Sequence, residues 1–286
     1  MVTVEARAKI NLTLDILGMR QDKFHAVETI MQTVDLYDTV ELERTDGEIT
    51  LAVDNPDVPE GKENLAWQAA AYMKKRHLTD KQGVSIKIAK RIPMGAGLGG
   101  GSADAAAVIR GINELYGLNL SGAKLCRRGA KIGSDVPFCV HGGTALGTGR
   151  GEILTELPPL GKLYVVIAKP DFSVSTAWAY GQFDKIKTDL RVDTRSVEAC
   201  LFAHDAVGVA KLLGNVLEIP IVAEYPQIKK LKEIMLSCGA LGALMSGSGS
   251  AVYALVKTKA QVKKIVTALK KENVEIFSTE TYIANA

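Results

Sequence analysis

The stretch from residue 93 to residue 107, PMGAGLGGGSADAAA, constrains the fold of this chain more than any other. Five of the seven residues from position 95 to position 101 are glycine. Glycine has no Cβ atom to hold a backbone away from a ligand, and it adopts positive φ angles readily. The three alanines at its end favour a helix. The stretch therefore predicts a tight loop that leads into a helix.

The residues on either side of this loop predict a strand before it and a helix after it. Residues 84–88 alternate between apolar and polar side chains, as a strand does. After the loop, Ser102 is a suitable N-cap, apolar residues recur at helical spacing, and Gly117 can end the helix. A helix N-terminus attracts anions through its unpaired N–H groups. We therefore expect a phosphate site here; the alternative is a turn that only permits close helix packing.

Two familiar phosphate-binding patterns do not fit the loop. Its glycine spacing satisfies G-x-G-x-x-G, but a dinucleotide site has an acidic residue about 20 positions later, at the end of a second buried strand. The residues around Glu114 predict a helix instead. The P-loop pattern G-x-x-x-x-G-K-[ST] runs from Gly95 to Ser102, except that Gly101 occupies the lysine position. A phosphate site here must take its lysine from elsewhere.

Length, charge and cysteine spacing limit the class of protein. The 286 residues suffice for one large domain or two ordinary ones. A net charge of +3 is too small to predict a nucleic-acid or acidic-membrane partner. We expect neither a leader sequence nor a membrane span, because no apolar run is long enough. Four widely spaced cysteines predict neither a zinc site nor a disulfide framework. We expect a cytoplasmic protein with reduced, mostly buried thiols.

Period-two alternation, strongest from residue 10 to residue 16, predicts a strand near the N-terminus. Lys9 and Asn11 project from one face of this strand, while Ile10 and Leu12 project from the other. The strand thus offers a lysine and an amide side by side. An ordinary lysine on an edge strand is the alternative interpretation.

Two later positions carry polar groups whose role the local pattern leaves open. Phe24 and His25 stand in or beside a turn over residues 18–25, where they could enclose a ring ligand or form a core aromatic with an exposed histidine. Asp135 precedes Pro137 by two residues, which is typical of a turn before a strand at residues 139–140. Residues 142–151 have the composition of a loose loop.

The remaining chain predicts further strands and helices, and a second unit from Gly161 onward. Strands are expected at 29–34, 39–44, 163–168, 251–256 and 274–278, and helices at 63–76, 120–131, 175–183, 194–202, 204–213, 227–238 and 259–272. Asn64 is the candidate N-cap of the first of these helices. Ser-Gly-Ser-Gly at residues 246–249 can form a hairpin turn. The order of elements after it resembles half of a ferredoxin-like domain.

The motifs, taken together and in this order, resemble the GHMP kinase superfamily and, within it, the 4-diphosphocytidyl-2-C-methyl-D-erythritol kinase family. The resemblance runs from the first strand to the last helix. It implies an α+β fold with an N-terminal mixed α/β nucleotide-binding domain (1–160), a C-terminal ferredoxin-like domain (161–286) and an active site in the cleft between them. The matching stretches are AKINL (8–12), GMRQDKFH (18–25), residues 93–107, GSDVPF (133–138), GRGE (149–152) and SGSGS (246–250).

The resemblance implies an activity and its catalytic residues. Members of this kinase family use ATP and Mg²⁺ to phosphorylate the 2-hydroxyl of their cytidyl substrate, in non-mevalonate isoprenoid biosynthesis. The positions that match Lys9 and Asp135 form the catalytic pair, and the aspartate takes the proton of the attacking hydroxyl. Lys9 thus supplies the lysine that the glycine loop lacks. The metal ligands stay open, with Ser102 as a candidate metal or phosphate contact.

The resemblance also implies the binding residues. Asn11 would hold the acceptor, and His25 would recognise the edge of the base. Phe24 and Tyr180 would stack on the cytosine, with Trp178 as the less favoured alternative to Tyr180. Three positions depart from the family pattern: Lys23 replaces the usual glycine, Phe24 replaces the commoner tyrosine, and Ser134 replaces the more usual alanine. The expected ATP-binding residues are Asn64 and Lys90 near the adenine, and Pro93, Met94, Gly95, Ala96, Gly97, Leu98, Gly99, Gly100, Gly101, Ser102 and Ala103 around the phosphates.

Two other functions compete with this one. Another GHMP kinase could phosphorylate homoserine or mevalonate, but such a small acceptor has no base to stack on Phe24 and Tyr180. A nucleotide-binding protein without turnover is the second alternative, and the intact Lys9, Ser102 and Asp135 argue against it. In each case the expected partner is a small molecule.

Overall fold

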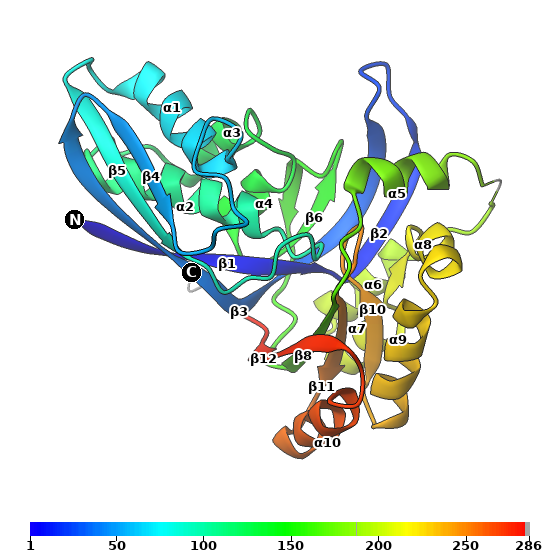
Figure 1. Ribbon diagram of the computed structural model, residues 1–286. Helices are drawn as coiled ribbons and strands as arrows, with labels where there is room; N and C mark the ends of the chain where they lie inside the picture. Colours follow the sequence, from blue (N-terminus) through cyan, green and yellow to red (C-terminus); the bar gives the residue numbers. More distant parts are fainter. Residues whose placement is uncertain (187, 284–286) are drawn as a thin grey trace. The chain divides into compact units, whose positions relative to one another are not determined.

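The computed structural model describes residues 1–186 and 188–283, and the chain divides into two compact units. The first unit comprises residues 1–8, 36–92 and 99–142; the second comprises residues 9–35, 93–98 and 143–286. Strands β1 (Val2–Asn11) and β3 (His25–Asp46) therefore contribute residues to both units (Figure 1). The boundary expected at residues 160 and 161 stays a prediction.

The first unit packs four helices with a small sheet. Within this sheet β5 (Gln82–Ala89) pairs antiparallel with residues 39–46 of β3 and parallel with β4 (Ile49–Val53). Helix α1 (Leu65–His77) packs against α2 (Gly100–Leu115), which also contacts α3 (Gly122–Gly129) and α4 (Val136–His141) (Figure 1). The alanines of α2 are buried, and a Cβ on Gly111 would lie 2.4 Å from Leu42 Cδ1, so the small residues let α2 approach β3 closely.

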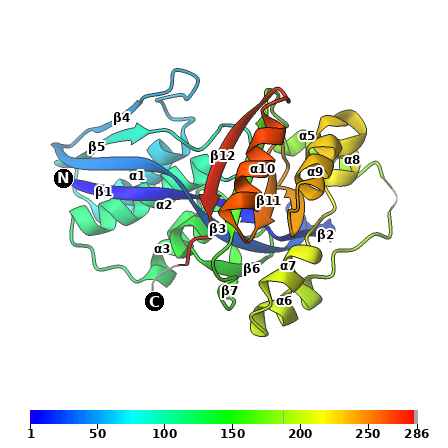
Figure 2. The ribbon, with the colours of Figure 1, turned by 90° about the horizontal axis from the view of Figure 1, so that it is seen from below.

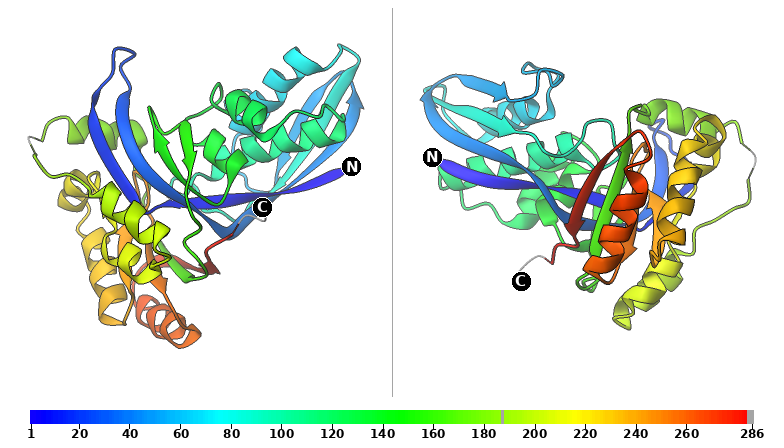
Figure 3. Two further views of the ribbon diagram at one scale, coloured as in Figure 1. Left: turned by 180° about the vertical axis from the view of Figure 1, so that it is seen from behind. Right: turned by 60° about the horizontal axis from the view of Figure 1, so that its bottom comes forward.

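The second unit contains a four-stranded antiparallel sheet in the order β10-β11-β8-β12. Helices α9 (Gln227–Ser237) and α10 (Lys259–Leu269) pack side by side on this sheet (Figures 2 and 3). The order β8-α9-β10-β11-α10-β12 along the chain is that of a ferredoxin-like domain, as expected. The strands are β8 (Tyr164–Pro170), β10 (Gly242–Met245), β11 (Val252–Val256) and β12 (Val274–Glu280).

The rest of the second unit consists of a second set of strands and four short helices. Strand β2 (Thr13–Met19) and β6 (Thr144–Thr148) both pair antiparallel with the first part of β3. Figure 3 shows β2 and β3 side by side as a long hairpin. The other elements are β7 (Ile153–Glu156), β9 (Gly214–Asn215), α5 (Thr176–Phe183), α6 (Thr194–Phe202), α7 (Ala206–Lys211) and α8 (Glu218–Glu224).

Three expectations about local structure were wrong. Residues 139–140 lie in helix α4, with Asp135 at the N-cap position and Pro137 in the first turn, where its missing N–H is not needed. Residues 144–148, expected in a loop, form β6. Ser102 is not the N-cap of α2: that position belongs to Gly99, whose φ is 72°.

Two further observations concern membrane spans and cysteines. Among the described residues, no helix combines the length and the apolar character that crossing a bilayer requires. All four cysteines are free thiols; Cys238 is buried, and Cys126, Cys139 and Cys200 are partly buried.

Candidate active site

Lys9 and Asn11 lie side by side at the end of β1, as the alternation predicted. Lys9 is only 4% exposed, and its Nζ donates a hydrogen bond to Asn11 Oδ1 at 2.7 Å. Asn11 Nδ2 in turn donates to Thr29 Oγ1 at 2.8 Å, and that hydroxyl donates to the carbonyl of Thr13 at 2.6 Å. A chain of hydrogen bonds therefore fixes the amide that holds the ammonium group.

The main chain of Lys9 is bound to the glycine loop. Lys9 N donates to the carbonyl of Leu98 at 3.0 Å, the last loop residue that belongs to the second unit. A lysine is thereby tied to the loop whose own sequence lacks one, although residue 9 is far from residue 98 along the chain.

The loop segment 93–98 packs tightly against the turn between β10 and β11. Gly97 has a φ of 74°, and a Cβ on it would lie 2.0 Å from the carbonyl oxygen of Ser246. Ser246 Oγ donates to the carbonyl of Gly97 at 2.9 Å, and Ala251 N donates to that of Ala96 at 3.1 Å. The Ser-Gly-Ser-Gly stretch is the expected hairpin turn, and it also supports the glycine loop.

Gly247 in that turn lies against the Lys9–Asn11 pair. A Cβ on Gly247 would be 3.4 Å from both Lys9 Nζ and Asn11 Oδ1. Asn215 Nδ2 holds the turn by donating to the carbonyls of Met245 and Gly247, at 3.0 and 2.8 Å. Lys9, Asn11, the loop segment 93–98 and the turn at 246–250 thus form one cluster within the second unit.

The start of α2, in the first unit, presents the remaining glycines. Gly101 is exposed, and the nearest atom to a Cβ on it would be Leu65 Cδ1 at 3.7 Å, so packing does not require a glycine there. The bare backbone leaves the N–H groups of the first turn accessible, which suits a phosphate group. Ser102 Oγ lies about 4.0 Å from the Cβ position of Gly133, which shares the Gly133–Phe138 motif with Asp135.

Lys90 belongs to a buried ionic cluster in the first unit. Its Nζ is 2.5 Å from Asp38 Oδ2 and 2.7 Å from Asp104 Oδ2, and its side chain is 6% exposed. Asp38 Oδ1 also accepts hydrogen bonds from the backbone N–H groups of Arg91 and Ile92. The cluster therefore joins the segment that enters the glycine loop to the first turn of α2.

Burial dominates the protonation of this cluster. Desolvation raises the pKa of Asp104 to about 7, against the opposing charge of Lys90. Burial alone would disfavour the charged form of Lys90, but the two carboxylates outweigh it and raise the pKa of Lys90 above its ordinary value. Asp104 Oδ1 has no hydrogen-bond partner among the described residues.

Asn64 is the N-cap of α1, as predicted. Its Oδ1 accepts a hydrogen bond from Ala66 N at 2.8 Å, and its Nδ2 donates to the carbonyl of Pro59 at 2.7 Å. Both polar atoms of Asn64 therefore already have partners in the protein.

The three residues expected around a cytosine lie in the second unit, each with a defined neighbour. The rings of His25 and Tyr180 contact each other, with centroids 4.8 Å apart and planes tilted by 36°. Phe24 is 51% exposed, and the guanidinium carbon of Arg150 lies 4.7 Å from its ring centroid. His25 Nε2 is hydrogen-bonded to Asp184 Oδ1 at 2.7 Å.

No local sequence pattern predicts a role for Arg150 or Asp184, although Arg150 lies in the GRGE motif. Glu152 of the same motif holds Arg150: its Oε2 accepts from Arg150 N at 2.5 Å, and its Oε1 is 3.5 Å from Arg150 Nε. Gly149 lies next to β3, where its carbonyl accepts from Val27 N at 2.9 Å. The motif thereby brings Arg150 to the hairpin that carries Phe24.

Lys23 adopts a backbone conformation that favours glycine. Its φ is 65°, in the left-handed region that a side chain disfavours. Asp22 closes the turn by accepting a hydrogen bond from Phe24 N at 3.2 Å. Lysine in this turn therefore carries an energetic cost that glycine would avoid.

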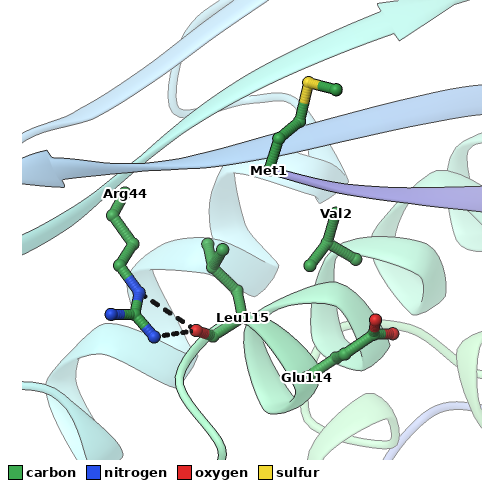
Figure 4. Close-up of a pocket in the computed structure, with 5 residues that line it drawn as sticks. All are labelled: Met1, Val2, Arg44, Glu114 and Leu115. Carbon is green, nitrogen blue, oxygen red and sulfur yellow. Dashed lines mark hydrogen bonds between the residues drawn. The ribbon is translucent and has the colours of Figure 1, made fainter.

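A hollow in the first unit is separate from these residues. It has a volume of about 460 Å³ and is lined by Met1, Val2, Arg44, Glu114 and Leu115 (Figure 4). Arg44 donates hydrogen bonds to the carbonyl of Leu115 at the end of α2 (Figure 4). No expected site residue is among the five that line it.

No group of three or more His, Cys, Asp and Glu side chains that could hold a metal ion occurs among the residues that the structure describes. In nucleotide sites Mg²⁺ is commonly bound by one or two carboxylates together with the phosphates of the substrate.

Comparison with known proteins assigns the family. A sequence model of the GHMP kinases N terminal domain matches residues 64–143, and a model of the GHMP kinases C terminal domain matches residues 197–275. The chain belongs to the GHMP kinases. The two-domain fold of these kinases, with its mixture of helices and sheets, is therefore confirmed.

Two curated relatives of this GHMP kinase share the same name. The 4-diphosphocytidyl-2-C-methyl-D-erythritol kinase of Brevibacillus brevis is 46% identical over 94% of this chain and 92% of its own length. The enzyme of that name from Acetivibrio thermocellus is 42% identical over 98% of this chain and 99% of its own.

Solved structures of GHMP kinases superpose well. A crystal structure of 4-(cytidine 5'-diphospho)-2C-methyl-D-erythritol kinase has a TM-score of 0.82 and 30% identity, over 99% of this chain and 100% of the other. Homoserine kinase from Cytophaga hutchinsonii has a TM-score of 0.78 and 23% identity, over 99% and 94% of the two chains. At that identity the likeness shows the fold alone.

Proposed function

We propose that this GHMP kinase transfers the γ-phosphoryl group of ATP to the 2-hydroxyl of 4-diphosphocytidyl-2-C-methyl-D-erythritol, giving ADP and the 2-phosphate. One observation carries the proposal: eight relatives of that name are 41–46% identical to this chain over 94–99% of its length. The reaction belongs to non-mevalonate isoprenoid precursor biosynthesis, and we assign it to the cytoplasm, where ATP is available.

Lys9 and Asp135 are the proposed catalytic residues. The 2-hydroxyl oxygen attacks the γ-phosphorus, the bond from that phosphorus to the β,γ-bridging oxygen breaks, and the hydroxyl proton passes to the Asp135 carboxylate. The Lys9 ammonium stabilises the negative charge that develops on the transferred group. The bond from Lys9 Nζ to Asn11 Oδ1 supports this role, because a held ammonium needs no reorganisation during the reaction.

The ATP phosphates are proposed to bind along residues 93–103. Positive φ angles at Gly95, Gly97 and Gly99 and the bare backbone at Gly101 support this placement, because they let N–H groups approach an anion. Mg²⁺, bound mainly by the phosphates, would neutralise charge during transfer, with Ser102 as the candidate protein contact. Asn64 and Lys90 remain the proposed neighbours of the adenine.

The cytosine is proposed to bind at Phe24, His25 and Tyr180, with Asn11 near the acceptor. The half-exposed Phe24 ring and the contact between His25 and Tyr180 support this placement, because a base needs an aromatic face and a polar edge. Homoserine and mevalonate offer no ring for such a surface. The division into domains 1–160 and 161–286 is part of the same proposal.

The test compares ATP consumption by the purified protein with Mg²⁺ and three acceptors in parallel: the cytidyl compound, homoserine and mevalonate. Turnover with the cytidyl compound alone is the expected result. Turnover with a small acceptor would support kinase activity but contradict the proposed cytosine site. No turnover with any of the three would favour a non-catalytic nucleotide-binding protein.

Two variants test the assigned residues. We expect Asp135→Asn to lower kcat at least ~100-fold with little change in ATP affinity, because it removes the base and keeps the shape. Asp205→Asn is the matched control, since asparagine replaces aspartate well at a helix N-cap.

We expect Tyr180→Ala to weaken binding of the cytidyl substrate by roughly 1–3 kcal/mol. Normal turnover by Asp135→Asn, or unchanged affinity in Tyr180→Ala, would remove that residue from the site.

A further inference from the structure

His25 is held on two sides by residues of a single helix end. Tyr180, in α5, contacts its ring at a centroid distance of 4.8 Å, and Asp184, the C-cap residue, binds its Nε2 at 2.7 Å. Residues four apart lie on the same side of a helix, and Asp184 N still donates to the carbonyl of Tyr180 at 3.0 Å. One element therefore supplies both the ring contact and the hydrogen bond.

Helix stability does not explain an aspartate at this position. The C-terminal end of a helix carries partial negative charge, so a carboxylate there is unfavourable. Asp184 is 43% exposed and His25 is 11% exposed, which makes the aspartate the outer partner of a more buried ring. The hydrogen bond to His25 is therefore the interaction that this carboxylate adds to the structure.

That hydrogen bond determines which nitrogen of His25 carries the proton. A carboxylate can only accept, so Nε2 must carry a hydrogen, and a neutral ring then has its lone pair on Nδ1. Asp184 is the only hydrogen-bonding side-chain partner of His25 within residues 1–186 and 188–283. An acceptor at Nδ1 matches the 4-amino group of cytosine and opposes the 4-carbonyl of uracil.

We infer that Asp184 is a positioning residue that fixes the tautomer of His25 and so makes the base site select cytosine over uracil. The inference rests on the proposed function, because it takes His25 to be the residue that recognises the base. Asp184 acts through His25, and the substrate binds without contacting Asp184.

The first test reads the tautomer directly and needs no turnover. The chain has only four histidines, so long-range ¹H–¹⁵N correlation spectra can resolve them, with His25→Gln identifying the resonance of interest. We expect the wild type to show a proton on Nε2. Asp184→Asn can present either an oxygen or an NH₂ group to Nε2, so we expect the tautomer of His25 to become mixed. An unchanged tautomer in Asp184→Asn would overturn the inference.

The second test measures selectivity. Calorimetric titration with cytidine diphosphate and uridine diphosphate gives the ratio of their Kd values for wild type, Asp184→Asn and the control Asp205→Asn. We expect the ratio to fall about tenfold in Asp184→Asn alone, the scale of one hydrogen bond to a charged or polar partner. With the full substrate, KM should rise while kcat and the KM for ATP stay unchanged.

The outcomes separate this inference from the proposed function. The inferred role of Asp184 in selectivity is overturned if Asp184→Asn keeps the wild-type ratio of Kd values, or if the wild-type protein binds neither diphosphate. Wild-type binding of cytidine diphosphate without phosphorylation of the cytidyl substrate would overturn the proposed function and keep the role of Asp184. Rescue of the ratio by Asp184→Glu, which restores a carboxylate, would support the tautomer argument over a loss of packing.

Discussion

Two alanine substitutions separate the packing role of Gly97 from the phosphate-binding role proposed for Gly101. In Gly97→Ala the new Cβ would lie 2.0 Å from the Ser246 carbonyl oxygen, at a residue with a φ of 74°. The left-handed conformation costs about 1–2 kcal/mol in a residue with a side chain, and displacing packed backbone adds about 1–3 kcal/mol. We therefore expect Gly97→Ala to lower the free energy of unfolding by roughly 2–5 kcal/mol.

Gly101→Ala is the counterpart in the same loop. Its Cβ would meet nothing closer than Leu65 Cδ1 at 3.7 Å, and the residue lies in the first turn of α2. Alanine at a helical position without strain stabilises by about 0.5 kcal/mol. If Gly101 faces the phosphates as proposed, the added methyl group should nevertheless raise the KM for ATP about tenfold, equivalent to about 1.4 kcal/mol.

Urea unfolding and the KM for ATP, measured on both variants, test whether Gly97 is needed for packing and Gly101 for ATP binding. Gly97→Ala should lose stability, and Gly101→Ala should keep stability and lose ATP affinity. A free energy of unfolding for Gly97→Ala within about 0.5 kcal/mol of the wild type, the range of ordinary surface substitutions, would refute the close packing of the two loops. An unchanged KM for Gly101→Ala would remove Gly101 from the ATP site.

Three other substitutions test single features. Lys23→Gly should raise the free energy of unfolding by about 1 kcal/mol in thermal melts, because glycine tolerates the φ of 65°; a lower melting temperature would contradict this. Burial raises the pKa of Asp104 from 3.8 to about 7, so its contribution to the free energy of unfolding is fully present below pH 3.8 and is lost as pH rises to about 7. Asp104→Asn, which stays neutral beside Lys90, should flatten this decline in urea unfolding between about pH 4 and about pH 7. Arg150→Met removes the cation above the Phe24 ring, worth about 0.5–1 kcal/mol, so the KM for the cytidyl substrate should rise about two- to fivefold, whereas a fall would show that Arg150 competes with the base.

Where the sequence predicted the local geometry of the candidate site, the reason was local chemistry. The glycines predicted a loop with positive φ angles, and the alternation along the strand predicted that Lys9 lies beside Asn11. Asn64 was predicted as a cap because its neighbours along the chain begin a helix. Each of these inferences needs only a few consecutive residues and the geometry of one element.

Where prediction failed, the decisive contact joins distant residues. Asp184 reaches His25 across 159 positions, and no local pattern distinguishes it from other aspartates after a helix. Residues 139–140 look like a strand because β-branched and aromatic residues surround them, yet packing of this segment against α2 and α3 makes it a helix. Lys23 stood out as a departure from the family, but its cost became visible only with the φ angle.

The contacts around the Lys9–Asn11 pair determine when this site is complete during protein synthesis. The carbonyl of Asn11 accepts a hydrogen bond from the hydroxyl of the buried Tyr253, 242 positions later. The residues around the lysine emerge from the ribosome well before the tyrosine that completes their surroundings, because 242 positions separate Asn11 from Tyr253. A growing chain therefore lacks a finished lysine site until residue 253 has been translated, so this site can form only after both structural units have largely been made.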